Sequence, residues 1–305
     1  MKVRRIVFAG LFLIAGLTVA SAQVNLSFNL EKGKKYEYRM DVVMNSQQSV
    51  GDQTSHRETE ISFQYLIEIK DNTPEEITAQ FSFTEIIYIV SSPNMKMGYN
   101  TKNPIENPTD VDKMFGKMLN NLINQPFLVV IAPDGSIKSV TGLDAIYENA
   151  VNAISDDDPI AAQLGVQMRS QFGDTPIKNS LEMLLNFYPA KVVEVGDSWN
   201  IERKTSVNNM TTTTKSKFTL KELSEKMATI AAVFDMETKA NPDAGMERKI
   251  VVSSIATIVV DVNTGLPITG DYTTNIKGSG KVQGMDMQVD GTEKMKTTGT
   301  VLRKK

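Results

Sequence analysis

Apolar and polar residues alternate along most of the chain, on both sides of a central block at residues 126–199. In the segment 36–44 the apolar residues Tyr36, Tyr38, Met40, Val42 and Met44 occupy every second position. A period of two with one apolar face is typical of a strand in an antiparallel sheet. The same alternation returns after Ser198. It predicts strands near 198–207, 210–222, 226–238, 247–261, 266–278 and 281–300.

The first half holds further expected strands. Residues 58–70 have Ile61, Phe63, Tyr65, Ile67 and Ile69 on one face, and residues 77–90 continue the alternation until the segment becomes apolar on both faces. A strand that is apolar on both faces is expected to be covered on each side. We also expect a short opening strand at Asn25–Leu30 and a polar hairpin tip at Ser46–Ser55. A weak strand follows at 94–101, and the strands near Phe127–Val140 turn at Pro133–Gly135.

A helical period appears between the two strand-rich regions. Thr109 is suited to cap a helix over 109–123, whose apolar residues recur every three or four positions. Three more helices are predicted, near 143–154, from Asp156 to Gly173, and from Thr175 to Tyr188. Apolar helix stripes need a surface to cover, and the apolar sheet faces of 36–44, 61–69 and 250–260 supply one.

The expected fold class is therefore α+β and mainly antiparallel β. We predict a curved sheet, or one or two half-barrels, of about ten or more strands, with the helical segment packed on the concave face. The expected organisation is a signal peptide (1–22), an N-terminal β unit (23–140) that includes helix 109–123, a helical connector (141–190) and a C-terminal antiparallel β unit (191–305).

Two stretches suggest an internal duplication. Glu31–Tyr38 aligns with Glu194–Ile201, so that Gly33 meets Gly196 and Tyr36 meets Trp199. Each half later reaches a hairpin that closes on a glycine, Gly135 or Gly265. The alternative is that antiparallel proteins repeat turn-then-aromatic patterns by chance, since the match is short and has no strict period.

The first residues have the pattern of an export signal. Three cations, Lys2, Arg4 and Arg5, precede an apolar run that ends in Ala20–Ala22, a small-residue cleavage site. The run is shorter than the roughly 20 residues of a membrane span. No cysteine follows it that could carry a lipid. We expect cleavage near Ala22–Gln23, no transmembrane segment in the mature chain, and a periplasmic or secreted protein.

Composition narrows the chemistry. A formal net charge of −3 without a basic cluster argues against nucleic-acid binding. With no Cys and a single His, the chain cannot build a multi-His or Cys-ligated zinc site. A Ser-His-Asp triad would need His56, which lies in a polar segment where a solvated histidine is the simpler interpretation. Asp156–Asp158 resemble helix-capping acids more than a cation loop. We expect no cofactor, no metal and no enzyme activity.

Methionines give the strongest indication of a ligand. Met114 and Met118 share one helix face, and flexible thioether side chains adapt to apolar ligands, although ordinary core packing is the simpler interpretation. The leading hypothesis is non-catalytic binding of a lipid or acyl chain between sheet and helices. The alternative is a structural or partner-binding envelope protein with a filled core and no ligand; a protein partner is left open. The candidate cavity lining is Met114, Phe115, Met118, Leu122, Phe63 and Trp199.

Several motifs together resemble a family of exported, uncharacterised proteins common in Bacteroidota. They are the leader ending in Ala-Ser-Ala, the opening Lys32–Tyr36, and the segments Pro133–Asp144, Val195–Trp199 and Val260–Gly265. The resemblance implies an envelope location and a β-rich domain, and it implies no catalytic residues. The layout is also distantly similar to periplasmic lipoprotein carriers, in which a curved sheet wraps helices over an apolar cavity. That similarity is one of architecture and is weak evidence of function.

Overall fold

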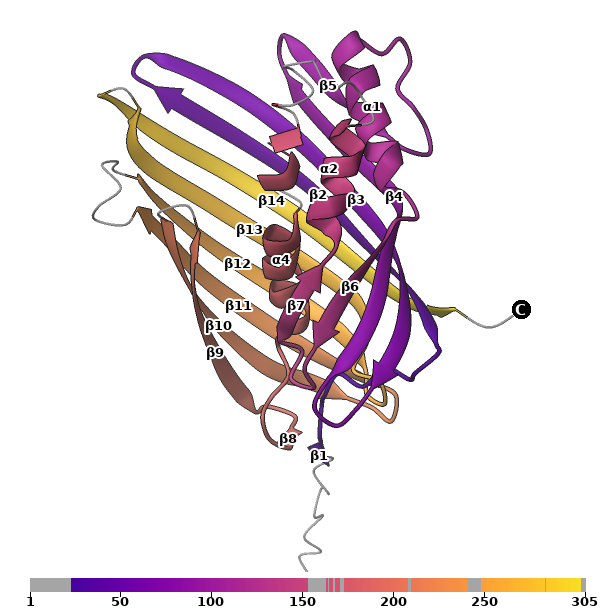
Figure 1. Cartoon of the computed structure of the whole chain (residues 1–305). Helices are drawn as coiled ribbons and strands as arrows, with labels where there is room; N and C mark the ends of the chain where they lie inside the picture. The colour runs from indigo at the N-terminus through magenta and orange to yellow at the C-terminus, as the bar shows by residue number, and fades with distance from the viewer. Residues whose placement is uncertain are drawn as a thin grey trace, which may run out of the picture.

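A single curved sheet with helices on its concave side dominates the computed structural model (Figure 1). The structure describes residues 23–302 except 153–162, 164, 167, 171–172, 208–209, 241–247 and 283. The strands of the first half are β2 (Lys35–Val50), β3 (Gln53–Asn72), β4 (Ile77–Ser92), β5 (Met95–Asn100), β6 (Pro126–Ile131) and β7 (Ile137–Thr141). Those of the second half are β9 (Ser198–Val207), β10 (Met210–Leu223), β11 (Met227–Ala240), β12 (Arg248–Asp261), β13 (Pro267–Val282) and β14 (Met285–Leu302).

All pairings between these strands are antiparallel, and the sheet is open. The order is β7-β6-β4-β3-β2-β14-β13-β12-β11-β10-β9, with β5 beside the far half of β4. Most neighbours in the sheet are also neighbours in sequence, as short hairpin turns require. There are two exceptions among the described strands. β4 pairs with β6 across the intervening β5 and α1, and β14 pairs with β2, which joins the two strand-rich halves into one twelve-stranded sheet. The predicted fold class is confirmed.

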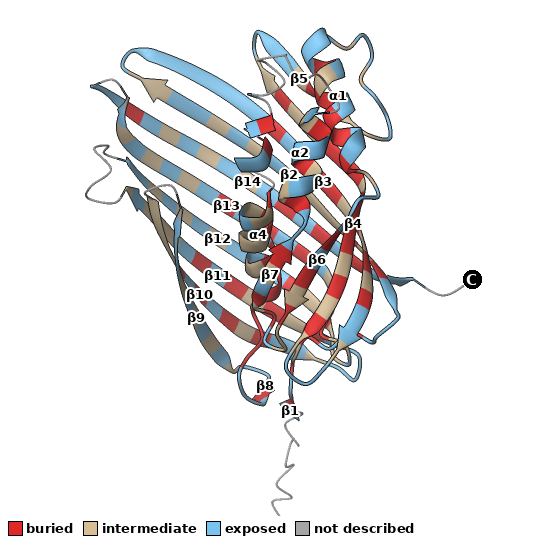
Figure 2. Ribbon diagram, in the orientation of Figure 1, coloured by how far each residue is buried: buried red, intermediate tan, exposed pale blue. Residues whose placement is uncertain are grey.

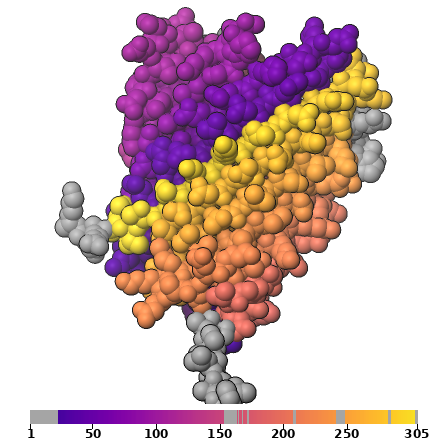
Figure 3. Space-filling model, turned by 180° about the vertical axis from the view of Figure 1, so that it is seen from behind, coloured from indigo at the N-terminus to yellow at the C-terminus, as the bar shows by residue number. Residues whose placement is uncertain are grey.

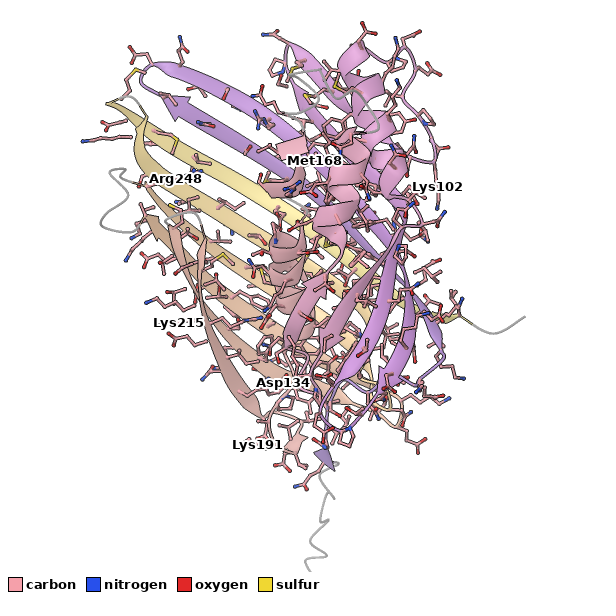
Figure 4. The ribbon with its side chains drawn as sticks, viewed as in Figure 1. Lys102, Asp134, Met168, Lys191, Lys215 and Arg248 are labelled. Atoms are coloured by element: carbon pink, nitrogen blue, oxygen red, sulfur yellow. The ribbon has the colours of Figure 1, made fainter. Side chains whose placement is uncertain are left out.

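Two glycine turns show how the hairpins fit the interior. Gly135, between β6 and β7, has a φ of +78°, and a Cβ there would lie 1.9 Å from the carbonyl oxygen of Leu185. Gly265, between β12 and β13, has a φ of +68°, and a Cβ there would lie 2.1 Å from the carbonyl oxygen of Ser27. Both positions therefore need glycine for backbone angle and for space. Asp134 lies in the first of these turns, near the lower end of the molecule in Figure 4.

The helices with described bounds lie on the concave face: α1 (Asp110–Leu122), α2 (Leu143–Asn152) and α4 (Asp174–Leu185). The α1 start is a capping box, in which Thr109 and Asp112 satisfy each other's backbone N–H groups. Asp112 also accepts a hydrogen bond from the N–H of Gly98, which ties α1 to β5. Together, α1, α2 and α4 confirm the helices predicted from the sequence near 109–123, 143–154 and 175–188. The predicted helix from Asp156 to Gly173 falls largely outside the described residues, as does the predicted leader, 1–22.

The core lies between the helices and the concave face, where buried residues gather (Figure 2). Its largest fully buried side chains include Tyr36, Phe81, Phe115, Tyr147 and Phe187. The convex face, seen from behind in Figure 3, carries mostly exposed residues, and β14 crosses it between the two halves. Towards the hairpin ends, in the described parts of 45–58, 236–252 and 276–290, few side chains are buried.

Two sequence predictions were wrong in detail. Residues 25–30 form no strand; the short β1 (Gln23–Val24) pairs with β8 (Val193–Glu194) instead. Leu26, Phe28 and Leu30 alternate because their side chains are buried, while the N–H of Phe28 donates to the Pro133 carbonyl at a turn. The predicted tip at 46–55 does contain the hairpin turn, at Gly51 and Asp52, but the strands continue up to Val50 and from Gln53, because the Ser, Gln and Thr side chains suit a sheet solvated on both faces.

Candidate functional site

A pocket of about 200 Å³ lies between α4 and the concave face of the second half of the sheet. Its roof is Met183 and Leu184 of α4. Its floor comes from the four strands β11 to β14, and it is apolar apart from a few groups. The floor residues are Phe234, Met236, Val252, Ser254, Tyr272, Thr274, Ile276, Glu293 and Met295.

Strand register explains why residues so distant in sequence share this floor. Phe234 is directly opposite Ser254, Ser254 opposite Thr274, and Thr274 opposite Glu293. Residues opposite one another across antiparallel strands point to the same face, so these side chains form one row across four strands. A second row, Met236–Val252–Ile276, runs alongside it. The period of two along each strand thus brings the pocket floor together.

The roof helix α4 is fixed at both ends. At its start, the Asp174 carboxylate accepts the N–H of Leu143 at 2.9 Å, and the N–H of Asp174 donates to Asp144 at 3.2 Å. Near its end, the guanidinium of Arg203 on β9 donates to the Glu182 carbonyl at 2.6 Å. A cation at a helix C-terminus is favourable for the helix dipole. Burial lowers the pKa of Arg203, consistent with its position under the helix.

Polar groups in the pocket differ in how well they are satisfied. The Thr274 hydroxyl donates to Ser254 Oγ at 3.0 Å. The half-buried carboxyl of Glu293 has no hydrogen-bond or ion-pair partner within the described ranges, and burial raises its pKa. Glu293 is the one acidic residue in the pocket lining, which also includes Met295, Leu184 and Ile276.

A second hollow, about 730 Å³ and wide open, lies mainly on the convex face near the hairpin ends. Its lining is polar and includes Asn45, His56, Glu58, Lys277 and Asp290. His56 is exposed on β3 and pairs with Gln47 across the ladder. The structure therefore gives the one histidine a solvated position, and no sheltered nucleophile for a triad is seen beside it in the described chain. The part of the chain that is described also holds no group of three or more His, Cys, Asp or Glu side chains suited to bind a metal.

The six cavity residues proposed from the sequence lie elsewhere. Phe115, Met118 and Leu122 of α1 are fully buried in the core, and Phe63 packs its ring 5.5 Å from that of Phe83. Met114 is half-buried against the same core. Trp199, on β9, stacks on Phe218 and donates its indole N–H to the Phe187 carbonyl at 2.8 Å. None of the six is among the residues that line the pocket under α4.

One pocket residue, Glu293, stands out in the sequence pattern of its strand. Glu293 falls in phase with Met287 and Met295, so an acidic residue occupies the side of its strand that carries methionines. A charged residue on the buried phase of a strand is unusual unless it has a role. What sequence alone could not provide is the sheet order that places β14 beside β13 and under α4.

A family model matches residues 75–267 of the chain, which run from β4 through the helices to the end of β12. The chain belongs to DUF6263, a family of unknown function. No curated protein sequence matches this DUF6263 member. The resemblance to an uncharacterised family, expected from its motifs, is therefore confirmed at the level of a family without known function.

Solved structures similar to this DUF6263 member have very different sequences. A structure concerned with lipid–protein interactions in lipovitellin has a TM-score of 0.47 at 10% identity, over 90% of this chain and 25% of that chain. OccK7 of Pseudomonas aeruginosa has a TM-score of 0.23 at 7% identity, over 89% of this chain and 100% of that one. An outer membrane channel of Pseudomonas putida F1 has a TM-score of 0.23 at 8% identity, over 90% of this chain and 97% of that one. The chain thus spans a quarter of the lipovitellin chain, and none of these likenesses carries a function over to it.

No helix among the described residues of this DUF6263 member is both long enough and apolar enough to cross a membrane.

Proposed function

We propose that the protein binds a small apolar or amphipathic ligand, such as an acyl chain, in the pocket between α4 and the sheet, without chemically changing it. The observation that carries this proposal is the pocket itself: a concave space of about 200 Å³ lined by Met, Leu, Phe, Val and Ile with a few polar groups. Such a lining is typical of small-molecule sites. Three methionines, Met183, Met236 and Met295, allow it to adjust to ligand shape.

The size of the pocket limits the ligand. Drug-sized ligands occupy roughly 300–1,000 Å³, so a space of about 200 Å³ suits a single alkyl chain rather than a whole two-chain lipid. The leader at 1–22 supports placing this binding in the periplasm or outside the cell.

Neighbouring valines provide a matched test. Val252 faces the pocket, while Val251 is 39% exposed on the convex face of the same strand. Val252→Phe should fill part of the pocket and weaken binding of a fluorescent alkyl probe by about tenfold, whereas Val251→Phe should bind as the wild type does. Native mass spectrometry of the purified protein should also show a bound alkyl compound. Equal probe binding by both variants, or none by the wild type, would contradict the proposal.

A second candidate, a partner-binding envelope protein, is supported by exposed apolar residues on the convex face. Val233 and Ile255, opposite each other on β11 and β12, are 46% and 62% exposed. A photocrosslinking residue at Ile255 should capture a partner in cells if this face binds one. Equal capture from the exposed Thr298, at a distant point of the same face, would contradict this candidate.

A further inference from the structure

We infer that the ligand of the α4 pocket carries a hydrogen-bond donor, an ammonium or hydroxyl head group, that is recognised by Glu293. This inference rests on the proposed binding function and narrows its ligand class from alkyl compounds in general to alkyl amines and alcohols. It follows from the position of one carboxyl in an apolar pocket, from the absence of a described protein partner for it, and from what a ligand must offer to satisfy it.

The position of Glu293 is fixed by the sheet. Its neighbours along β14, Thr292 and Lys294, point to the convex face and are exposed, while Glu293 points to the concave face opposite Thr274 on one side and Met44 on the other. A carboxylate in this phase is held inside the pocket by the pleat of the strand. It cannot reach bulk solvent on the convex face without disrupting the ladder.

The Thr274 hydroxyl, directly opposite Glu293 on β13, donates to Ser254 at 3.0 Å and not to the carboxyl. Arg203 donates to the Glu182 carbonyl and is not among the residues that line the pocket. Among the described residues none donates to the Glu293 carboxyl, so a bound ligand that carries a donor can pair with it.

The energetics favour a donor. The Glu293 carboxyl is half-buried without a described protein partner, and this burial raises its pKa because it disfavours the charged form. An ammonium group would form an ion pair with the carboxylate, and a hydroxyl group would hydrogen-bond to it. A fatty acid would instead bring a second carboxylate next to Glu293, which is unfavourable for both. The apolar lining then holds the alkyl chain, and the carboxyl selects its head group.

Three ligands of equal chain length test the selection: dodecylamine, dodecanol and dodecanoate, each used below its micelle concentration to displace a neutral fluorescent alkyl probe. The wild type should bind the amine and the alcohol at least about tenfold more tightly than dodecanoate. Glu293→Gln should lose about tenfold of the preference for the amine. Glu293→Leu, which suits the apolar lining, should bind the neutral probe and show no head-group preference. Asp290→Asn, an exposed acid on the convex face of the same strand, is the matched control and should behave as wild type.

The outcomes separate the two proposals. If the wild type binds the neutral probe but prefers dodecanoate, or treats all three head groups alike, the Glu293 inference is wrong while ligand binding in the pocket stands. A loss of amine preference in Asp290→Asn equal to that in Glu293→Gln would also contradict it. If the folded wild type binds neither the probe nor any of the three compounds, both proposals fail.

Discussion

At the scale of single residues, Glu85 shows how this sheet accommodates a buried charge. Its side chain is 8% exposed on β4, where its carboxylate accepts hydrogen bonds from Arg39 at 2.9 Å and Lys102 at 2.8 Å. Burial alone would raise the pKa of Glu85, but the hydrogen bonds from Lys102 and Arg39 outweigh it, and the pKa lies below its usual value. Glu85 is thus satisfied by two cations, whereas Glu293 has no described partner.

Glu85→Gln should therefore lower the free energy of unfolding by about 1–3 kcal/mol at neutral pH, because it removes hydrogen bonds to a charged group. A carboxylate with a lowered folded-state pKa stabilises the fold above its unfolded-state pKa, and this contribution disappears as the pH falls through the folded-state pKa. The difference between variant and wild type should shrink below about pH 4. Urea unfolding at several pH values measures it. Glu76→Gln, at a surface pair with Lys138, should change stability by about 0–1 kcal/mol.

At the scale of elements, the contact between the β6–β7 turn and the end of α4 links the sheet to the pocket roof. Gly135 has a positive φ, and a Cβ there would collide with the Leu185 carbonyl. Gly196 also has a positive φ, of +99°, but a Cβ there would have no heavy atom within 4 Å. Alanine substitutions at the two glycines therefore distinguish the cost of a left-handed backbone conformation from the cost of a steric clash.

Gly196→Ala should cost about 1–2 kcal/mol of unfolding free energy, the value of left-handed backbone strain alone. Gly135→Ala should cost about 3–5 kcal/mol and should also weaken alkyl probe binding, because the clash displaces α4. Thermal or denaturant unfolding together with probe titration would measure both. Equal costs for the two variants would show that the turn does not press on α4.

The sequence predicted elements better than it predicted the candidate site. Helix 109–123 was readable because its apolar residues follow a helical period and Thr109 caps it. The extended run at 25–30 was misread as strand because alternation reports which side chains are buried, not which backbone groups pair. The pocket depends on long-range sheet order and on where α4 crosses, and neither leaves a local pattern in the chain.

At the scale of the whole molecule, the two strand-rich halves follow the same plan. The N–H of Gly33 donates to Ile69 at 2.8 Å, and the N–H of Gly196 donates to Leu220 at 2.8 Å. A bulge follows Ile69 and another follows Leu220. Strand order also matches, with β2-β3-β4-β6-β7 in one half and β9-β10-β11-β12-β13 in the other. These correspondences extend the aligned segments of the sequence well beyond their first eight residues, as a duplication predicts.

Because β14 pairs with both β13 and β2, the two halves should unfold together. Denaturant unfolding followed by the fluorescence of Trp199, in the second half, should share one midpoint with far-UV circular dichroism, which reports on the whole sheet. A fluorescent label on an engineered cysteine at Lys70, in the first half, should report that midpoint as well. Two separate midpoints would show that the halves are stable independently.

The pairing of β14 with β2 also determines the order in which parts of the sheet can form during synthesis. Gln48 and Met287 hydrogen-bond across this seam although 239 residues separate them. A nascent chain has therefore made its first hairpin long before the strand that covers the open side of β2 exists. During that interval β2 presents unpaired backbone to any other extended chain nearby. Because the late strand β14 must enter the middle of the sheet beside the early strand β2, the topology predicts slow folding.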